Sequence, residues 1–116
     1  MSVVRDIKPI PRRVLVHSVE VQVLSGVATF GKQYDPAVVV KNVRIQPAYK
    51  IKRTYEGEEV DVQSQLFIDT RHSSPAMSLP IGSKVNWRGS EMVVIGCDPM
   101  FALDGETPHH YEVHLI

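Results

Sequence analysis

The last eight residues constrain the possible fold more than any other stretch of this chain. Tyr111, Val113 and Leu115 alternate with polar side chains, and this two-residue period is typical of a β-strand with one buried face. The alternation continues to residue 116, so we expect an ordered strand within a sheet here and not a loose tail. The polar positions include histidines, which raises the alternative of a metal site on the same strand.

The spacing of these histidines argues against a metal site. His110 and His114 share a face, but they lie four residues apart, about 13 Å along a strand, which is too far for two ligands of one ion. Glu112 lies between them and could pair with either one. Motifs for phosphate binding, nucleophilic catalysis or thiol redox chemistry are absent from the sequence. We therefore predict no catalytic residues, no metal ligands, no cofactor and no enzymatic activity.

Length and charge set further limits. A chain of 116 residues has the size of one domain and can bury a core without disulfides or metals, so we expect a single domain over residues 1–116. Thirteen basic residues balance thirteen acidic ones, so no global electric field gathers nucleic acid or a membrane surface. Cys97 is the only cysteine, and we interpret it as a small, half-buried apolar residue.

The N-terminal segment shows no signature of export. Residues 1–11 contain two prolines and the charged Arg5, Asp6 and Lys8, which interrupt the apolar run that a signal peptide needs. No other apolar run is long enough for a membrane-spanning helix. We expect residues 1–11 to form an extended arm, the protein to be made in the cytoplasm, and no membrane to be involved.

Alternating apolar residues predict strands along most of the chain, and almost nothing favours a helix. Residues 15–23 form one half-buried strand, in which His17 is best interpreted as an interior or rim histidine. Residues 38–53, with the odd positions from Val39 onward on one face, are expected to form a long hairpin with residues 59–68. Pro47 cannot donate to a ladder, so an edge, a bend or a bulge is expected there.

That hairpin carries opposite charges on its two strands. Lys50, Lys52 and Arg53 lie on the first strand. The turn and the second strand carry the acids Glu56, Glu58, Glu59 and Asp61. A basic patch for phosphate is one interpretation. Cross-strand pairing on a solvated face is favoured, because the acids stand where they would neutralise the bases.

Two short strands over residues 83–87 and 91–95 flank a tight turn at Arg88-Gly89, and Trp87 is expected against the core. A loop with Asp98 and Pro99 then leads to the last strand, which begins near His109. The count is five or six strands, and closure of the sheet would remove exposed edges. We therefore predict an all-β fold, a small closed or partly open antiparallel β-barrel of about six strands with two long loops.

The predicted long loops are residues 25–36 and residues 69–82. The first holds Phe30 and Tyr34, whose rings either pin the loop to the core or await a partner, with neither alternative favoured. The second is rich in serine and proline but contains apolar residues, so it is expected to pack on the barrel. These apolar residues are Met77, Leu79 and Ile81.

Five segments of the chain resemble the minor capsid or head-closure proteins of long-tailed phages and prophages. They are residues 11–19, 40–47, 65–69, 82–89 and 108–116. The closing His-His-Tyr-Glu-Val at residues 109–113 is the most specific of them, whereas the Gly-x-Lys-Val-x-Trp-x-Gly hairpin at residues 82–89 is common in small β domains. His114 stands where an acidic residue is expected in similar proteins, a departure that leaves the strand pattern intact.

The resemblance implies a small β-barrel that forms a ring below the portal, between the capsid vertex and the tail. Such a ring retains the packaged genome and offers the surface on which the tail docks. Its partners would be the portal or an adaptor protein, a tail protein and further copies of itself, and it could be a monomer in isolation. DNA would pass through the channel without sequence-specific contact. The protein would be made in the host bacterial cytoplasm and reside in the neck of the virion.

On this view the two predicted loops become candidates for contacts with neighbouring subunits or the channel. The candidate residues are Phe30, Tyr34, Arg71, His72 and Met77. The loop of residues 69–82 is the candidate gate, and deleting residues 73–78 is expected to leave folding intact but release DNA from filled heads. A small β-barrel that binds nucleic acid or carbohydrate is the alternative function.

Overall fold

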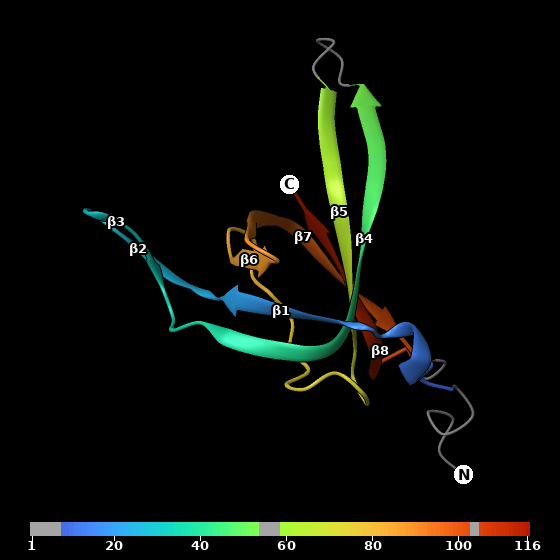
Figure 1. Ribbon diagram of the computed structural model, residues 1–116. Helices are drawn as coiled ribbons and strands as arrows, with labels where there is room; N and C mark the ends of the chain where they lie inside the picture. The colour runs from blue at the N-terminus through green and yellow to red at the C-terminus, as the bar shows by residue number, and fades with distance from the viewer. Residues whose placement is uncertain (1–7, 54–58, 103–104) are drawn as a thin grey trace.

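The protein is an all-β molecule built around one closed barrel. The computed structural model describes residues 8–53, 59–102 and 105–116, with the backbone alone described for residues 48–53 and 59–63. Six strands close the barrel in the order β1-β4-β5-β8-β7-β6, with antiparallel neighbours, and β2 and β3 form a separate two-stranded sheet (Figure 1). The predicted all-β barrel of about six strands is confirmed.

One short 3₁₀ helix, η2 (Arg12–Val14), precedes the strands. The strands are β1 (His17–Gln22), β2 (Leu24–Ala28), β3 (Gly31–Tyr34), β4 (Val38–Arg53), β5 (Glu59–Asp69), β6 (Lys84–Trp87), β7 (Ser90–Phe101) and β8 (Pro108–Leu115). Among the described residues, no helix has the length and apolar character needed to span a membrane.

The final strand, β8, behaves as its alternation predicts. Val113 and Leu115 are fully buried, and Tyr111 packs partly against the core. Strand β8 pairs with β5 along one edge and with β7 along the other. Backbone hydrogen bonds in both directions then join Ile116 to Val93, at 3.0 and 2.9 Å. Strand β8 ends at Leu115 and Ile116 still bonds to Val93, so the expected ordered final strand is confirmed to within one residue.

The core fills the inside of the barrel and consists largely of valine, whose branched side chain suits a pleated, buried surface. The six barrel strands supply Val19, Val21, Val40, Val43, Ile45, Leu66, Ile68, Val85, Met92, Val94, Val113 and Leu115. The loop between β5 and β6 adds Leu79. Trp87 packs partly against this cluster beside Val85, as predicted.

His17 lies at the rim of the core, where the interpretation from the sequence is confirmed. Its ring meets Trp87 edge-on, with centroids 5.1 Å apart. The N–H of Ile45 donates to Nδ1 of His17 at 3.1 Å, which requires that nitrogen to be unprotonated. Burial lowers the pKa of His17, and the nearby charges of Arg88 and Arg44 lower it further.

Acidification should therefore destabilise the protein through His17. The unfolded chain holds this residue at an ordinary pKa of about 6.5, so the unfolded state takes up the proton first. The stability that the neutral ring contributes is fully present above about pH 6.5 and is lost as the pH falls through the lower folded pKa. His17→Asn can still accept the Ile45 N–H but does not titrate, so it should flatten this part of the profile in urea unfolding. A variant profile as steep as the wild-type profile would contradict the assignment.

Strand β4 contains a bulge that shifts its buried face by one residue. Val40 is fully buried while Val39 is 47% exposed, so the prediction that odd positions face inward from Val39 onward is wrong before Asn42. His17 pairs with Val43 and Val19 pairs with Val40, which leaves one extra residue on β4. Asn42 absorbs it with a φ of 56°, a left-handed conformation that asparagine tolerates better than most residues. Beyond this bulge Val43 and Ile45 face inward as predicted, whereas Pro47 is exposed and the side chains of Tyr49 and Ile51 lie outside the description.

Strands β4 and β5 continue past the barrel as a two-stranded ribbon (Figure 1). Strand β8 covers β5 only from Ser64 to Asp69, and β1 covers β4 only from Val38 to Val43. The register between β4 and β5 shifts between Pro47 and Lys50, so the irregularity predicted at Pro47 is confirmed. The predicted turn at residues 55–58 and the predicted charge pairing along this hairpin lie outside the described backbone or side chains.

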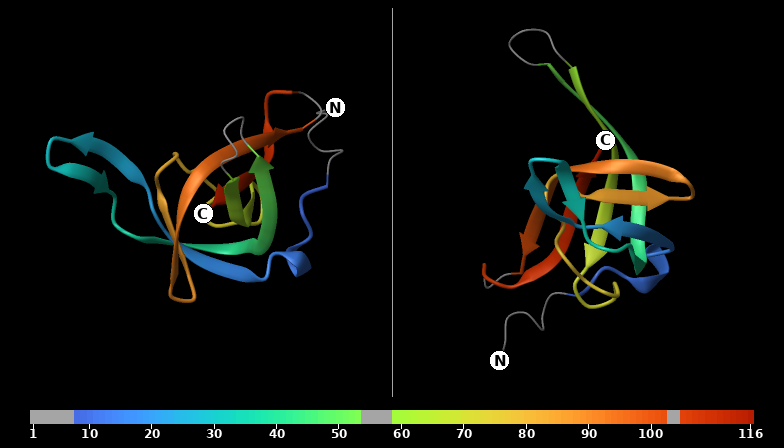
Figure 2. Two further views of the ribbon diagram at one scale, coloured as in Figure 1. Left: turned by 90° about the horizontal axis from the view of Figure 1, so that it is seen from above. Right: turned by 90° about the vertical axis from the view of Figure 1, so that its left-hand side faces the viewer.

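Residues 25–36 are not the loop that the sequence predicted. They contain most of a β-hairpin, β2–β3, which pairs Leu24 with Tyr34 and Ala28 with Gly31 around a two-residue turn. Gly31 follows the turn with a φ of 119°, a conformation that favours glycine. The prediction failed because this hairpin leaves the barrel and has little buried face to produce an apolar alternation (Figure 2).

Strand β7 is also longer than predicted. Asp98 and Pro99 were expected in a loop, but they lie within β7, which pairs with β8 from Val94 to Phe101. Strand β6 pairs with β7 only from Ser90 to Val93. In the part of the chain that the structure describes, no strand therefore covers the second edge of β7 beyond Val93. A proline, which lacks an N–H, is tolerated at such an edge.

Candidate functional site

Two of the three histidines of β8, His110 and His114, lie beside carboxylates. His110 Nε2 lies 3.3 Å from Glu112 Oε1, so Glu112 pairs with His110, one of its two candidate partners. His114 Nε2 lies 3.0 Å from Asp98 Oδ2 on β7. Among the residues that the structure describes, no three His, Cys, Asp or Glu side chains gather as a metal ion would require. His114 and Asp98 therefore form a polar link between β8 and β7, whereas His110 and Glu112 pair within β8.

Asp69, at the end of β5, ties two separate segments to the barrel. Its side chain is fully buried. Its carboxylate accepts the backbone N–H groups of Ile10, Arg71 and His72 at 3.2, 3.1 and 2.8 Å. Asp69 was not predicted from the sequence as a functional or structural tie, although an aspartate that ends a strand and accepts N–H groups two and three residues later is a known turn pattern.

The N-terminal segment has two further ties beside Asp69. His72 Nδ1 donates to the carbonyl oxygen of Ile10 at 2.9 Å. His109 Nε2 donates to the carbonyl oxygen of Lys8 at 2.7 Å. These bonds hold residues 8–11 against the barrel, and residues 1–7 lie outside the description, so the extended arm expected over residues 1–11 stays a prediction.

The loop between β5 and β6 is fastened to the barrel at both halves. Ser73 Oγ donates to the carbonyl oxygen of Asn42 at 2.6 Å and accepts the N–H of Asp69 at 2.9 Å. Ser74 and Lys41 exchange two backbone hydrogen bonds of 2.9 and 3.1 Å. These bonds argue against the expectation that deleting residues 73–78 leaves folding intact, because the deletion would remove them. The expected release of DNA stays a prediction.

The apolar residues of this loop differ in how far they are buried. Leu79 is buried in the core and Met77 packs partly against it, so the expected packing of the loop is confirmed for these two. Ile81 remains 67% exposed. Of the other candidate contact residues, Arg71 is exposed and His72 is half-buried. A role of Arg71, His72 or Met77 in partner contacts stays a prediction.

The β2–β3 hairpin, residues 24–34, forms an arm that leaves the barrel (Figures 1 and 2). Phe30 at its turn is 81% exposed, and Val27 on β2 is 75% exposed. These are the two most exposed large apolar side chains in the described chain. An aromatic ring in this segment was expected either to pin the segment to the core or to await a partner. Phe30 fits the second alternative.

Tyr34 fits the other alternative, because it belongs to the fixed base of the arm. Lys84 Nζ lies 4.6 Å from the centre of the Tyr34 ring, a cation–π distance. The N–H of Leu24 donates to Ser83 Oγ at 3.0 Å. A Cβ atom added at Gly82 would come within 2.9 Å of the Leu24 side chain, so glycine allows the close approach of the β5–β6 loop to the arm. Phe30 and Tyr34 therefore share one segment but different environments.

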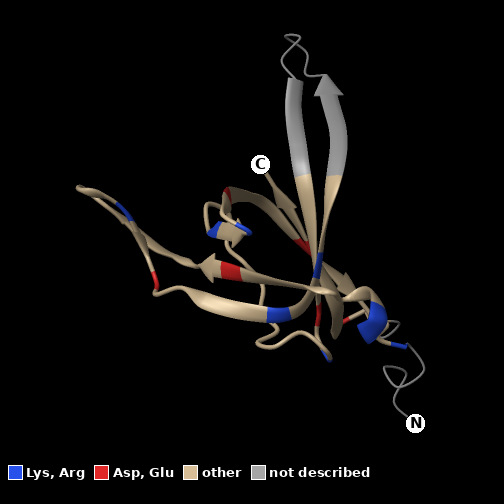
Figure 3. Ribbon diagram, in the orientation of Figure 1, with Lys and Arg blue, Asp and Glu red and all other residues tan. Residues whose placement is uncertain are grey.

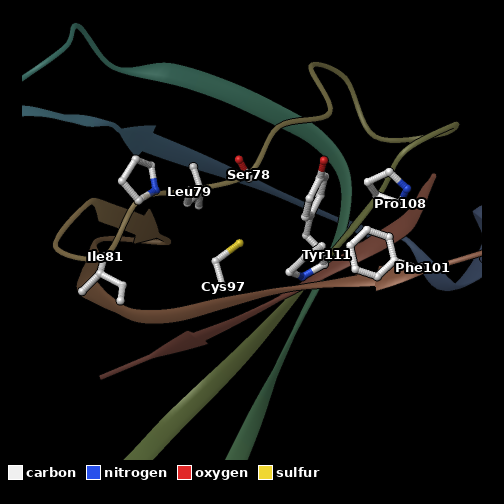
Figure 4. A pocket seen from close by; sticks show the side chains of 9 residues that line it. Ser78, Leu79, Ile81, Cys97, Phe101, Pro108 and Tyr111 are labelled. Carbon is white, nitrogen blue, oxygen red and sulfur yellow. The ribbon is translucent and has the colours of Figure 1, made fainter. Parts of the chain in front are cut away.

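An open groove runs between the uncovered part of β7 and the end of the β5–β6 loop (Figure 4). Its volume is about 570 Å³. The lining residues, all uncharged, are Ser78, Leu79, Pro80, Ile81, Cys97, Pro99, Phe101, Pro108 and Tyr111. The groove was not predicted from the sequence, because the strand predicted over residues 91–95 ended before Cys97, Pro99 and Phe101 of β7, which line the groove.

Cys97 lines the groove and is half-buried, as predicted. Burial raises the pKa of its thiol, the Leu79 backbone hydrogen bond opposes this shift, and the charge of Asp98 adds to it. The thiol form is therefore favoured at neutral pH, and the residue contributes mainly as an apolar wall of the groove.

Charged residues are spread along the described chain (Figure 3). Basic residues occur on η2, at the β6–β7 turn and on the β2–β3 arm, and acidic residues lie between them on β1, β7 and β8. Such interspersed charges do not form the continuous basic track that non-specific binding of a nucleic-acid backbone uses.

The chain was compared with known protein families, curated proteins and solved structures. A family model described as minor capsid protein matches residues 11–115, which include the whole barrel and the β2–β3 arm. No curated protein and no solved structure matches the chain. The matched residues include the five segments that carry the resemblance in the sequence, apart from residue 116. This chain belongs to the minor capsid protein family.

Proposed function

We propose that this minor capsid protein is a head-closure subunit, copies of which form a ring in the neck of a tailed phage or prophage particle. Membership of the family implies a structural role in the phage particle. In the proposed ring, the partners are the portal or an adaptor on the head side, a tail protein on the other side, and further copies of the chain. The ring retains packaged DNA, lets it pass without sequence-specific contact, and offers the tail a docking surface.

The observation that carries this proposal is a small barrel with two hairpins extending beyond it. The β4–β5 ribbon and the β2–β3 arm leave the barrel in different directions (Figures 1 and 2). The radius of gyration is 15.4 Å, whereas a compact chain of this length has one of about 13 Å. The chain therefore places much of its backbone where only neighbouring molecules could cover it.

Such hairpins favour assembly. A two-stranded hairpin alone is only marginally stable in water, and the arm leaves Val27 and Phe30 exposed. Contacts with neighbouring subunits would bury these side chains. When one kind of contact between two different surfaces is repeated, the copies form a ring if the rotation closes and an open filament if it does not. A ring is the arrangement that a channel between head and tail needs.

Disruption of the gene in the phage or prophage tests this proposal. We expect DNA-filled heads that lose their genomes and carry no tails, while separate tails still form, and we expect the intact gene supplied in trans to restore complete particles. Electron microscopy would count the particle types, and nuclease sensitivity would measure the released DNA. Mutant heads that retain DNA and attach tails normally would contradict the proposal.

A further inference from the structure

We propose that the β2–β3 arm of one copy inserts Phe30 into the groove beside β7 of a neighbouring copy. This inference rests on the proposed ring, because it names the contact through which adjacent copies hold one another. The contact joins two different surfaces of the same chain, so each copy gives an arm to one neighbour and receives an arm from the other.

The groove lies beside the part of β7 that β6 does not cover. Strand β6 covers β7 only as far as Val93, and the uncovered part of β7 contributes Cys97, Pro99 and Phe101 to the groove. Phe101 and Ile81, at 53% and 67% exposed, leave apolar surface open to water. The volume of about 570 Å³ leaves room for an aromatic ring to enter from outside (Figure 4).

The arm tip is apolar and can fill an uncharged groove. Phe30 and Val27 are its exposed apolar side chains, and Lys32 is the only charged residue between Leu24 and Tyr34. None of the groove residues is charged, so the ring of Phe30 can enter without stripping water from a charge. Aromatic residues seated in desolvated pockets commonly supply most of the binding energy of an interface.

A second copy is the occupant that the structure favours. The arm is fixed at its base by the bond from Leu24 to Ser83 and points away from the barrel (Figures 1 and 2), so its tip does not lie in the groove of its own chain. The chain carries no net charge, so copies do not repel one another.

The size of the contact agrees with assembly on a template. The arm comprises residues 24–34, about half of the 20–30 residues that each partner contributes to a standard stable interface. The contact is therefore too small for a tight dimer in dilute solution. It becomes effective where a portal holds several copies side by side, because the high local concentration then strengthens each weak contact.

Cysteine cross-linking tests this geometry, since the one native cysteine lines the groove. Phe30→Cys places a second thiol at the arm tip. In concentrated protein and in particles, copper–phenanthroline with air would oxidise one tip thiol and one Cys97 thiol to a disulfide between neighbours, with oxygen taking the electrons. Each chain then links to two others, so we expect a ladder of dimers, trimers and larger species on a non-reducing gel.

Matched controls separate this contact from chance collisions. Phe30→Cys in a Cys97→Ala background should give no species above a dimer. Val16→Cys, another exposed apolar position at 63% exposure, should give no ladder with Cys97. Only dimers with Phe30→Cys in both backgrounds would show that tips pair with tips, and this result would overturn the proposal.

A second measurement uses no cysteine chemistry. Phe30→Ala removes an exposed side chain outside the core and should weaken the self-association of concentrated protein by about tenfold or more in sedimentation equilibrium, as expected for loss of an aromatic anchor, with an unchanged circular dichroism spectrum. Equal self-association of the variant and the wild type would overturn the proposal. If Phe30→Cys particles carry the protein at the neck but form no ladder, the arm–groove contact fails while the proposed function stands. A ladder from a protein absent from the neck would support the contact and reject the proposed location.

Discussion

Asp69→Ala should lower the free energy of unfolding by about 3–5 kcal/mol, because three backbone N–H groups would lose their charged acceptor in a buried site. The acceptors of Ile10, Arg71 and His72 would all disappear with one side chain. The N-terminal segment and the β5–β6 loop would therefore loosen together. Urea unfolding followed by tryptophan fluorescence would measure the loss, since Trp87 packs against the core.

Two variants make this prediction specific. Asp69→Asn keeps one side-chain oxygen as an acceptor and should lose less stability than Asp69→Ala. Asp98→Ala removes a carboxylate whose side chain is 65% exposed, and it should cost less than about 1 kcal/mol. If Asp69→Ala unfolds at the same urea concentration as the Asp98→Ala control, Asp69 does not clamp these segments.

Removal of the β2–β3 arm should abolish assembly while leaving the barrel folded. The variant would replace residues 26–33 by a short glycine–serine turn and keep the base contacts of Leu24 and Tyr34. The removed residues include none of the buried core, so the free energy of unfolding should change by less than about 1 kcal/mol. Production of complete particles should fall by at least about thirtyfold, the factor that corresponds to a loss of about 2 kcal/mol at one interface.

A control on the same arm tests whether any change in the arm reduces assembly, or only loss of its apolar tip. Lys32→Ala changes an exposed polar position of β3 and should leave particle production close to the wild-type level. Particle counts by electron microscopy and infectivity in a complementation assay would measure both variants. Normal particle production without the arm would show that the arm takes no part in assembly.

The parts of the fold that the sequence predicts are those in which side chains alternate between core and solvent. Strands β1 and β8 place Val19, Val21, Val113 and Leu115 inside the barrel, so burial leaves a period of two in the sequence. The same signal predicts the long hairpin of β4 and β5. Composition also predicts one small all-β domain, because valine is abundant and helical periodicity is absent.

The incorrect predictions of the fold also have identifiable physical causes. One extra residue at Asn42 reverses the face of β4, and a single asparagine gives no periodic signal of a bulge. The β2–β3 arm has little buried face, so apolar alternation cannot mark it. Strand β7 continues through Pro99 because its second edge is uncovered there, a property of the neighbouring strand that the local sequence does not contain.

The candidate site was only partly predictable for a related reason. The sequence singles out Phe30 and Tyr34 as a pair in one segment, but only the structure separates the exposed tip from the fixed base. The groove requires residues from β7, β8 and the β5–β6 loop to meet, and this depends on tertiary packing. The clamp at Asp69 was predictable from a local turn pattern and was missed.

Electron cryomicroscopy of purified particles, with this protein located by a fused tag and absent in the gene disruption, tests the central claim most directly. The account predicts a ring of barrels between the portal and the tail, with each β2–β3 arm reaching the adjacent copy. Density for the protein on the capsid shell or at the tail tip, or isolated copies without contacts between neighbours, would contradict it.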